Sequence, residues 1–170
     1  MSNLINELLS FSRAEMDTAK VMLKTIELHP VLQRAVQRES MPTTEIFTKI
    51  EPKIRVIADP ELLARALANI IRNAVKYAGK AGPIHVSAKR LGEKIKIQVK
   101  DSGPGVPDDL VKHLFEPFFR PEPSRDRCSG SVGLGLAIVK TCIETRKGTV
   151  SARNLKPKGF SVTITLTSDT

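Results

Sequence analysis

The sequence predicts an α+β fold, a two-layer α/β sandwich in which helices cover one face of a mixed, mostly antiparallel sheet. Segments in which apolar and polar residues alternate, as in half-buried strands, are interspersed with segments in which apolar residues recur every three or four positions, as in amphipathic helices. Two pairs of strand-like segments follow one another directly, as in hairpins. The order of strands and helices is too irregular for a doubly wound parallel sheet.

The first predicted element is a short helical stub. Within residues 3–16, leucines and a phenylalanine recur at helical spacing with further apolar residues beside them, which predicts an amphipathic helix with a broad apolar stripe. We expect the chain to divide after this helix, into a stub over residues 1–17 and one globular domain over residues 18–170.

The first half of the domain predicts three short strands and a helix. Residues 20–28 alternate and predict a strand, and Pro30, which suits a first helical turn, begins a predicted helix. Two further strands are predicted over residues 44–50 and 55–58. These segments contribute to both layers of the sandwich.

The central helix has the clearest predicted boundaries. Asp59 is a good N-cap because its carboxylate can accept hydrogen bonds from backbone N–H groups, and Pro60 suits the first helical position. The helix is predicted to run to Ala78, with Gly79 ending it.

The second half of the domain predicts two hairpins and two helices. In chain order they are a hairpin over residues 83–101 that turns at Leu91-Gly92-Glu93, a short helix over 108–115, a loop over 115–132, a helix over 133–146, and a closing hairpin with strands at 148–154 and 159–167. No internal repeat is visible in the sequence.

Composition and charge limit the possible function classes. The chain has 170 residues, 41% of them hydrophobic, which suits one globular core, and no apolar run approaches the roughly 20 residues that span a bilayer. The net charge of +9 favours an anionic partner. Because the basic residues form no dense run and aromatic residues are few, we do not expect nucleic-acid binding. Cys128 and Cys142 are expected to be reduced thiols.

A polar stripe on the central helix is the first candidate site. Asn69, Asn73, Lys76 and Tyr77 fall on one side of this helix, since residues four apart differ by about 40° around its axis. Asparagine is a poor residue inside helices, so two of them suggest a polar site, although a solvated face is the alternative. Asparagine carbonyls suit Mg²⁺ that already holds phosphate oxygens, and a lysine supplies charge for a phosphate.

Two glycine-containing clusters are the next candidates. In “DSGPGVP”, Asp101 ends a strand, and Gly103 and Gly105 permit close approach of another group. Taken alone, this cluster is more simply an Asp–Gly turn. In “GSVGLGLAIV”, residues 130–139, glycines lead into a helix whose first N–H groups can bind an anion. This second cluster is neither a Walker loop, since no Lys-Ser/Thr follows, nor a Rossmann fingerprint, since no strand precedes it.

Four motifs occur in order: “NIIRNAVKY” from Asn69, “DSGPGVP” from Asp101, “FEPFFRP” from Phe115 and “GSVGLGLAIV” from Gly130. Together they resemble the N box, first glycine box, F box and second glycine box of bacterial two-component sensor histidine kinases. Their catalytic, ATP-binding domains are members of the gyrase-like ATPase superfamily. The resemblance implies the Bergerat fold, a mobile ATP lid over residues 106–132, and phosphoryl transfer from ATP–Mg²⁺ to a histidine.

The resemblance also implies roles for individual residues. Asn73 matches the magnesium-coordinating asparagine, Lys76 a base that contacts phosphate, and Asp101 the aspartate that reads the adenine amino group. Asn69, Lys76 and the lid arginine Arg120 are the expected catalytic residues, and the resemblance implies that they also contact the nucleotide. The other expected nucleotide contacts are Tyr77, Gly103, Gly105, Val106, Phe119, Gly133, Leu134, Gly135 and Leu136.

The asparagine at position 69 favours transfer over hydrolysis. Hydrolytic relatives such as gyrase carry a glutamate at this position, which activates water, whereas an amide cannot take up a proton near neutral pH. A neutral imidazole is already nucleophilic and needs less help. We therefore expect Asn69 to serve a kinase rather than an ATP hydrolase.

The acceptor histidine is not expected in this chain. His29, His85 and His113 lack the “HE-x-R-x-P” context of the family, whereas residues 1–17 resemble the end of its second dimerisation helix. The resemblance implies a soluble, cytoplasmic, monomeric fragment that binds ATP without autophosphorylating. Its partners would be its own dimerisation domain and a response regulator, and its parent a homodimer in the bacterial inner membrane. A serine-kinase anti-sigma relative and a non-catalytic nucleotide-binding regulatory module are the alternatives.

Overall fold

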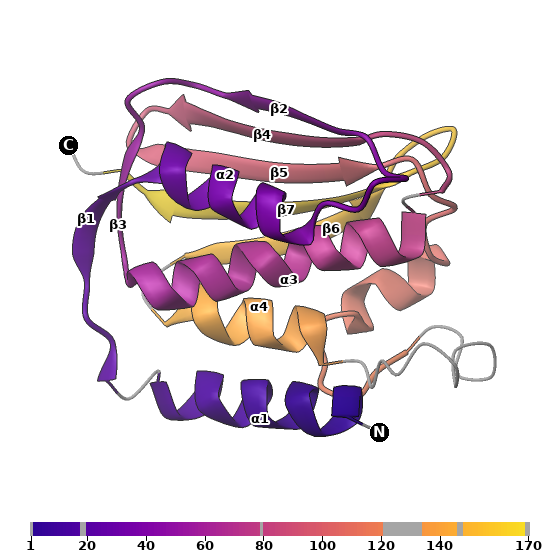
Figure 1. Ribbon diagram of the computed structural model, residues 1–170, viewed down its shortest axis with the longest axis horizontal. Helices are drawn as coiled ribbons and strands as arrows, with labels where there is room; N and C mark the ends of the chain where they lie inside the picture. Colours follow the sequence, from indigo (N-terminus) through magenta and orange to yellow (C-terminus); the bar gives the residue numbers. More distant parts are fainter. Residues whose placement is uncertain (1, 18–19, 79, 121–133, 146–147, 169–170) are drawn as a thin grey trace.

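The protein is a two-layer α+β sandwich (Figure 1). The computed structural model describes residues 2–17, 20–78, 80–120, 134–145 and 148–168. One layer is a five-stranded sheet, the other is made of helices on one of its faces, and a further helix, α1, packs against α4. The predicted fold class and the N-terminal helical stub are confirmed.

The five-stranded sheet has the order β2-β4-β5-β7-β6. Its strands are β2 (Ile46–Ile50), β4 (Ile84–Leu91), β5 (Lys94–Asp101), β6 (Thr149–Asn154) and β7 (Phe160–Thr167). β2 is parallel to β4, and the other neighbours are antiparallel, including both predicted hairpins. Asp101, at the end of the central strand β5, pairs with Phe160 of β7, so these two residues share one end of the sheet.

A separate antiparallel pair is formed by β1 (Lys24–Glu27) and β3 (Arg55–Ala58). The strand predicted over residues 20–28 is therefore shorter than expected. It ends because Leu28 is fully buried, donates its N–H to the Ile54 carbonyl oxygen at 3.0 Å, and begins the next helix. Pro30 is consequently the third residue of that helix, where a backbone N–H would have no helical partner.

The helices are α1 (Ser2–Asp17), α2 (Leu28–Glu39), α3 (Pro60–Ala78), α4 (Gly135–Glu144) and the 3-10 helix η2 (Asp108–His113). α3 has the predicted bounds because Asp59 caps it: Oδ1 accepts from the N–H groups of Glu61 and Leu62 at 3.0 and 3.2 Å. Gly79, the predicted stop, lies outside the described residues. The helix predicted over residues 108–115 is a 3-10 helix that ends two residues earlier.

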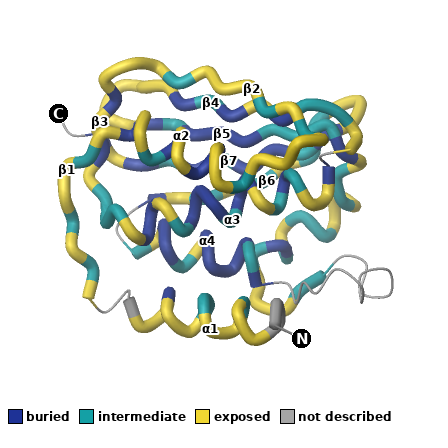
Figure 2. The backbone as a smooth tube through the Cα atoms, viewed as in Figure 1, coloured by how far each residue is buried: buried dark blue, intermediate teal, exposed yellow. Residues whose placement is uncertain are grey.

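The hydrophobic core lies between the sheet and the helices α2, α3 and α4 (Figure 2). On α3, Leu63, Leu67 and Ile71 are almost completely buried, and they belong to the same core cluster as Ile95, Ile97 and Val99 of β5. This packing fixes α3 across the sheet, so its C-terminal end is held beside the end of β5. Among the described helices, none has the length and apolar character needed to cross a lipid bilayer.

Candidate functional site

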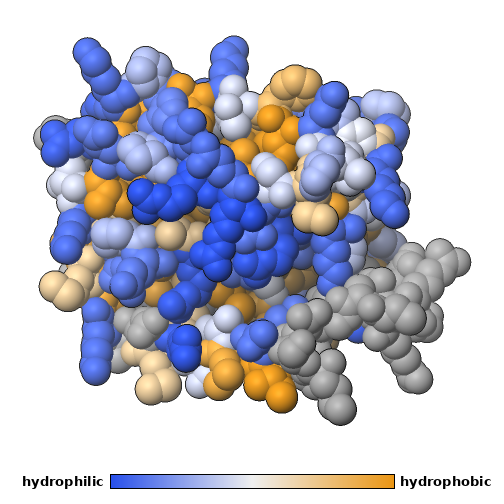
Figure 3. Space-filling model, in the orientation of Figure 1, coloured by the Kyte–Doolittle hydropathy of each residue, from blue (hydrophilic) through white to orange (hydrophobic). Residues whose placement is uncertain are grey.

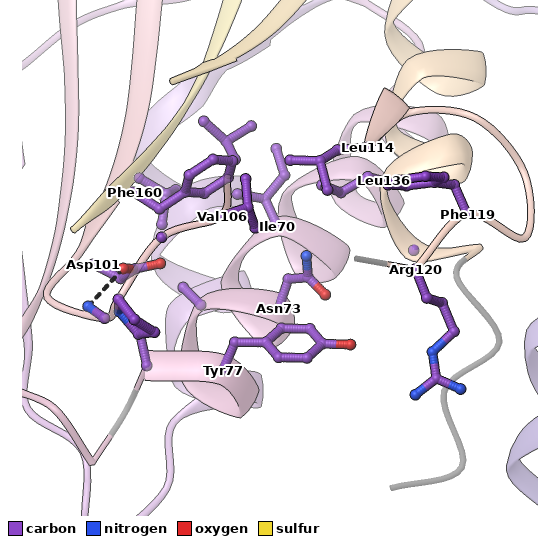
Figure 4. Close-up of a pocket in the computed structure, with 18 of the residues that line it drawn as sticks. Ile70, Asn73, Tyr77, Asp101, Val106, Leu114, Phe119, Arg120, Leu136 and Phe160 are labelled. Carbon is purple, nitrogen blue, oxygen red and sulfur yellow. Dashed lines mark hydrogen bonds between the residues drawn. The ribbon is translucent and has the colours of Figure 1, made fainter. Parts of the chain in front are cut away.

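A pocket of about 260 Å³ lies at the end of β5, between the second half of α3 and the start of α4 (Figure 4). The structure brings ten of the fourteen predicted nucleotide contacts to its lining, from segments far apart in the sequence. They are Asn73, Tyr77, Asp101, Gly103, Gly105, Val106, Phe119, Arg120, Gly135 and Leu136. Asn69, Lys76 and Leu134 do not line the pocket, and Gly133 lies outside the described residues.

The predicted polar stripe on α3 is only partly turned toward the pocket. Asn73 and Tyr77 line it, whereas Asn69 lies one turn earlier and donates from Nδ2 to the Arg65 carbonyl oxygen at 2.9 Å. Lys76 is exposed, with Nζ 5.3 Å from the centre of the Tyr77 ring. The stripe therefore spans the boundary between the pocket and solvent.

Asp101 forms one end of the pocket with a half-buried carboxylate. Its Oδ1 accepts the N–H of Gly103 at 2.9 Å (dashed in Figure 4). Burial raises the pKa of Asp101 above its ordinary value of 3.8, while hydrogen bonds from the backbones of Gly103 and Phe160 act in the opposite direction. A carboxylate that has lost part of its hydration is stabilised by an N–H donor from a ligand.

The glycine corner after Asp101 packs against the end of α3. A Cβ on Gly103 would lie 2.6 Å from the Cβ of Ala78, which is closer than two carbon atoms can pack. The close approach that glycine permits at position 103 is therefore that of Ala78, at the end of α3. Gly105 has a φ of 73°, in the left-handed region that favours glycine.

The N-terminus of α4 faces the asparagines of α3. A Cβ added to Gly135 would lie 3.8 Å from Oδ1 of both Asn69 and Asn73. The first N–H groups of a helix have no partners within it and favour anions. Leu134 is fully buried and anchors this end of α4 in the core, while Leu136 lines the pocket. Amide oxygens and helix N–H groups thus meet at one place.

The segment after η2 forms the far wall. Phe119 lines the pocket, and its ring contacts the His113 ring with 5.4 Å between centroids. Arg120 also lines the pocket; Figure 4 shows its side chain at the opposite end from Asp101, with Asn73 between them. The rest of the predicted lid, beyond Arg120, lies outside the described residues.

Sequence reasoning missed the apolar wall of the pocket and one contact behind it. Ile70 and Phe160 line the pocket beside Val106 (Figure 4). Phe160 could have been found from the hairpin register, since it pairs with the last residue of β5. Asn154 bonds to the backbone of Val106, which is 48 residues away in the sequence, and no sequence pattern indicates that contact.

The arrangement suits a ligand with a flat apolar ring, an amino edge and an anionic tail. Apolar side chains form the walls, a carboxylate lies at one end, and an amide oxygen, a helix N-terminus and an arginine lie toward the other. None of the three histidines of the chain lines this pocket.

Comparison with protein families gives a match over most of the chain. The family model described as “Histidine kinase-, DNA gyrase B-, and HSP90-like ATPase” matches residues 58–170. The sensor protein kinase WalK of Staphylococcus saprophyticus is 31% identical over 179 residues, which cover 98% of this chain and 28% of that protein. WalK of Staphylococcus aureus strain MRSA252 is 31% identical over 171 residues, with the same coverage. The chain thus spans little more than a quarter of the length of these relatives.

Solved structures give the same fold. The mycobacterial sensor histidine kinase MprB superposes with a TM-score of 0.77 at 27% identity, over 85% of this chain and 98% of that chain. Full-length ShkA, solved in complex with AMPPNP, superposes with a TM-score of 0.82 at 25% identity, over 98% of this chain and 35% of that chain. The second match includes the region of α1 as well as the sandwich.

Proposed function

Because the chain belongs to the family of histidine kinase-, DNA gyrase B- and HSP90-like ATPases, we propose that it binds ATP with Mg²⁺ and transfers the γ-phosphoryl group to a histidine on a separate dimerisation domain. It would be the catalytic domain of a two-component sensor histidine kinase. The observation that carries this proposal is the order of polar groups along the apolar pocket: Asp101, then Asn73, then Arg120 (Figure 4). That order matches a base, a metal ion and a phosphate chain.

The adenine ring would lie against the apolar wall, with its amino group toward Asp101. The ring would pack beside Ile70, Val106 and Phe160, which surround that end of the pocket. Gly103 fixes the orientation of the Asp101 carboxylate through its N–H. The amino group would then replace the water that burial has removed from the carboxylate.

The phosphates would lie at the N-terminus of α4. Asn73 offers a hard oxygen beside Gly135, and this donor type fits a Mg²⁺ ion that takes its other ligands from phosphate and water. When bound, the ion would neutralise charge on the phosphate oxygens. Lys76 and Arg120 would add positive charge from the solvent side and from the far wall.

Asn69 would favour transfer to a histidine over attack by water. Its Nδ2 is engaged with the Arg65 carbonyl oxygen, so Oδ1 is the end turned toward Gly135. An amide oxygen there can orient a ligand but cannot remove a proton from water at neutral pH. The chain's own residues would then contribute positioning and charge stabilisation, and the nucleophile would be an imidazole from another segment.

Helix α1 would be the end of the second dimerisation helix, so that residues 1–17 belong to that unit and residues 18–170 form the ATP-binding domain. Ile5 and Leu9 on this helix are 57% and 50% exposed, and Figure 3 shows hydrophobic surface along the lower edge, where Figure 1 places α1. Such a face suits packing in a helix bundle. The proposed setting is a homodimeric inner-membrane parent whose cytoplasmic part phosphorylates a response regulator.

Titration calorimetry with ATP tests the binding step. We expect saturable binding that needs Mg²⁺, and we expect Asn73→Ala to weaken binding and reduce its dependence on Mg²⁺. Gln33→Ala removes an exposed amide from α2 that does not line the pocket, and it serves as the matched control. An affinity that is the same with and without Mg²⁺ would contradict the role given to Asn73.

Transfer is tested by adding a histidine-bearing dimerisation fragment and ATP labelled at the γ-phosphate. We expect acid-labile label on the fragment and none on the chain itself. Binding of ATP without any transfer would support the nucleotide-binding regulatory module instead. Acid-stable label on a serine would support the serine-kinase relative.

A further inference from the structure

The side-chain amide of Asn154, the last residue of β6, hydrogen-bonds to the backbone at the glycine corner of the pocket. Its Oδ1 accepts the N–H of Val106 at 2.9 Å, and its Nδ2 donates to the carbonyl oxygen of the same residue at 2.5 Å. Nδ2 also donates to Oδ1 of Asp108 at 2.7 Å, at the first residue of η2. One side chain therefore satisfies two backbone groups and a carboxylate from a segment distant in the sequence.

Gly105 is shaped to allow this contact. A Cβ at Gly105 would collide with Oδ1 of Asn154. The left-handed φ of 73° at Gly105 turns the chain so that both polar backbone groups of Val106 face the amide. The second glycine of the corner is thus matched to the asparagine behind it, as well as to the pocket in front.

The segment bound by Asn154, residues 102–107, is neither helix nor strand. The ladder of β5 ends at Asp101, and η2 begins at Asp108, so residues 102–107 pair with no strand. Near its start the segment is held by the Asp101–Gly103 hydrogen bond and by Ser102, whose Oγ donates to the Pro83 carbonyl oxygen at 2.9 Å. Near its end it is held by the Asn154–Val106 pair. The amide of Asn154 thus takes the place of a missing strand partner.

We propose that Asn154 is a positioning residue for the nucleotide, because it holds Val106 and the start of the lid segment in the geometry that closes the adenine end of the pocket. This inference rests on the proposed function. Val106 lines the pocket between Ile70 and Phe160 (Figure 4), and Leu114, Phe119 and Arg120 follow in the same segment. Loss of the hydrogen bonds from Asn154 would let Val106 and the segment after it move without disturbing the hydrophobic core.

The chemistry requires an asparagine. The site needs one acceptor and two donors at the reach of a short side chain, and asparagine supplies all three. Asn154→Asp keeps the size and the acceptor but removes both donors, and it places a second carboxylate beside Asp108. Asp108→Asn keeps an acceptor for Nδ2 and is therefore the matched control for charge at this corner.

Hydrogen–deuterium exchange without nucleotide tests whether Asn154 holds the backbone of Val106 in place. In Asn154→Asp and Asn154→Ala, we expect the amide of Val106 to exchange at least about tenfold faster, while amides in β5 and β7 are unchanged. Asp108→Asn is expected to stay within about twofold of the wild type. Unchanged exchange at Val106 in both Asn154 variants would overturn the inference, whether or not the chain binds ATP.

The affinity for Mg²⁺–ATP separates a positioning role from a merely structural one. We expect Asn154→Asp to raise the dissociation constant about tenfold while the midpoint of urea unfolding stays close to that of Asp108→Asn. Faster exchange at Val106 with unchanged affinity would overturn the positioning role. A wild-type chain that binds no ATP would overturn the proposed function, and the exchange result would still decide whether Asn154 fixes the corner.

Discussion

The two halves of α3 perform different tasks although they form one continuous helix. The first half begins at Asp59, whose Oδ1 caps the helix and whose Oδ2 accepts the N–H of Met22 at 3.0 Å, in the segment that connects α1 to β1. There Leu63 shares a small cavity with Val21 of the same connection. The second half, residues 68–78, supplies every α3 residue that lines the large pocket.

The difference lies in what each half leaves open. At the first half, the polar N–H groups are satisfied and large leucines fill the core. Near the second end, Ala74 and Ala78 are small, so the glycine corner can approach and a pocket remains beside them. Stability and ligand binding should therefore respond separately to changes at opposite ends of one helix.

The largest expected effect is on stability at the first half. Leu63→Ala removes a side chain that is 2% exposed, and we expect the free energy of unfolding to fall by about 2–5 kcal/mol. The affinity of the folded protein for ATP should stay within about twofold, since Leu63 does not line the large pocket. Urea unfolding and calorimetry measure the two quantities, and a loss of affinity in folded protein would contradict the division.

The next effect is on binding at the second half. Asp101→Asn replaces the carboxylate acceptor by an amide that can still accept from Gly103. We expect ATP affinity to fall by about 10- to 100-fold, the cost of losing a hydrogen bond to a charged group. Titration calorimetry at neutral pH measures it, and unchanged affinity would remove Asp101 from adenine recognition.

The same variant should not lose stability at neutral pH. Because burial raises the pKa of Asp101 in the folded state, the protonated form favours folding, and this contribution is complete below the ordinary value of 3.8. It is lost as the pH rises through the raised pKa. The wild type should therefore become less stable relative to Asp101→Asn over that interval, which urea unfolding at a series of pH values measures. If the wild type instead became more stable relative to the variant as the pH rises, the pKa of Asp101 would not be raised.

A smaller effect is expected at the cap. Asp59→Ala removes the acceptor for two helix N–H groups and for Met22, and we expect a loss of about 1 kcal/mol in unfolding free energy. Asp59→Asn keeps an acceptor and should lose less than half of that. Amide exchange at Met22 should rise in Asp59→Ala only. An unchanged unfolding midpoint would show that the cap is not needed.

The smallest expected effect is at Arg72. It tests whether a residue in the second half of α3 affects ATP affinity even when it faces away from the pocket. Arg72 lies in the second half but points to α2, where its Nε and Nη2 donate to the Glu39 carboxylate at 3.1 and 2.8 Å. The arginine side chain is about half exposed, so Arg72→Ala should cost about 0.2–1 kcal/mol, less at high salt. ATP affinity should not change. A change in affinity would mean that the whole second half is coupled to the pocket.

The sequence predicts what local chemistry determines. Asp59 and Pro60 predicted the start of α3 because capping acts within one turn. Asn73 and Asp101 are assigned to one nucleotide site only through the order of four motifs, since each motif alone has a simpler interpretation. The structure brings both to one pocket.

The parts that the sequence did not predict depend on distant segments. Leu28 ends β1 because it is buried and donates a hydrogen bond to the Ile54 carbonyl oxygen, and the spacing of apolar residues in the sequence does not predict that contact. Asn154 reaches Val106 across 48 residues. Lys76 shares a stripe with Asn73 by helical geometry, yet it lies on the solvent side, because the neighbouring elements decide where the pocket ends.

The contact between Gly103 and Ala78 limits how this domain can evolve. No residue is smaller than glycine, so a larger side chain at position 78 could not be offset by a change at position 103. Variation in related lineages should therefore be one-sided: position 78 should remain small wherever the corner keeps this spacing. Ala78, which lies just beyond the “NIIRNAVKY” motif, thus sets with Gly103 how closely the helix and the glycine corner approach each other beside the pocket.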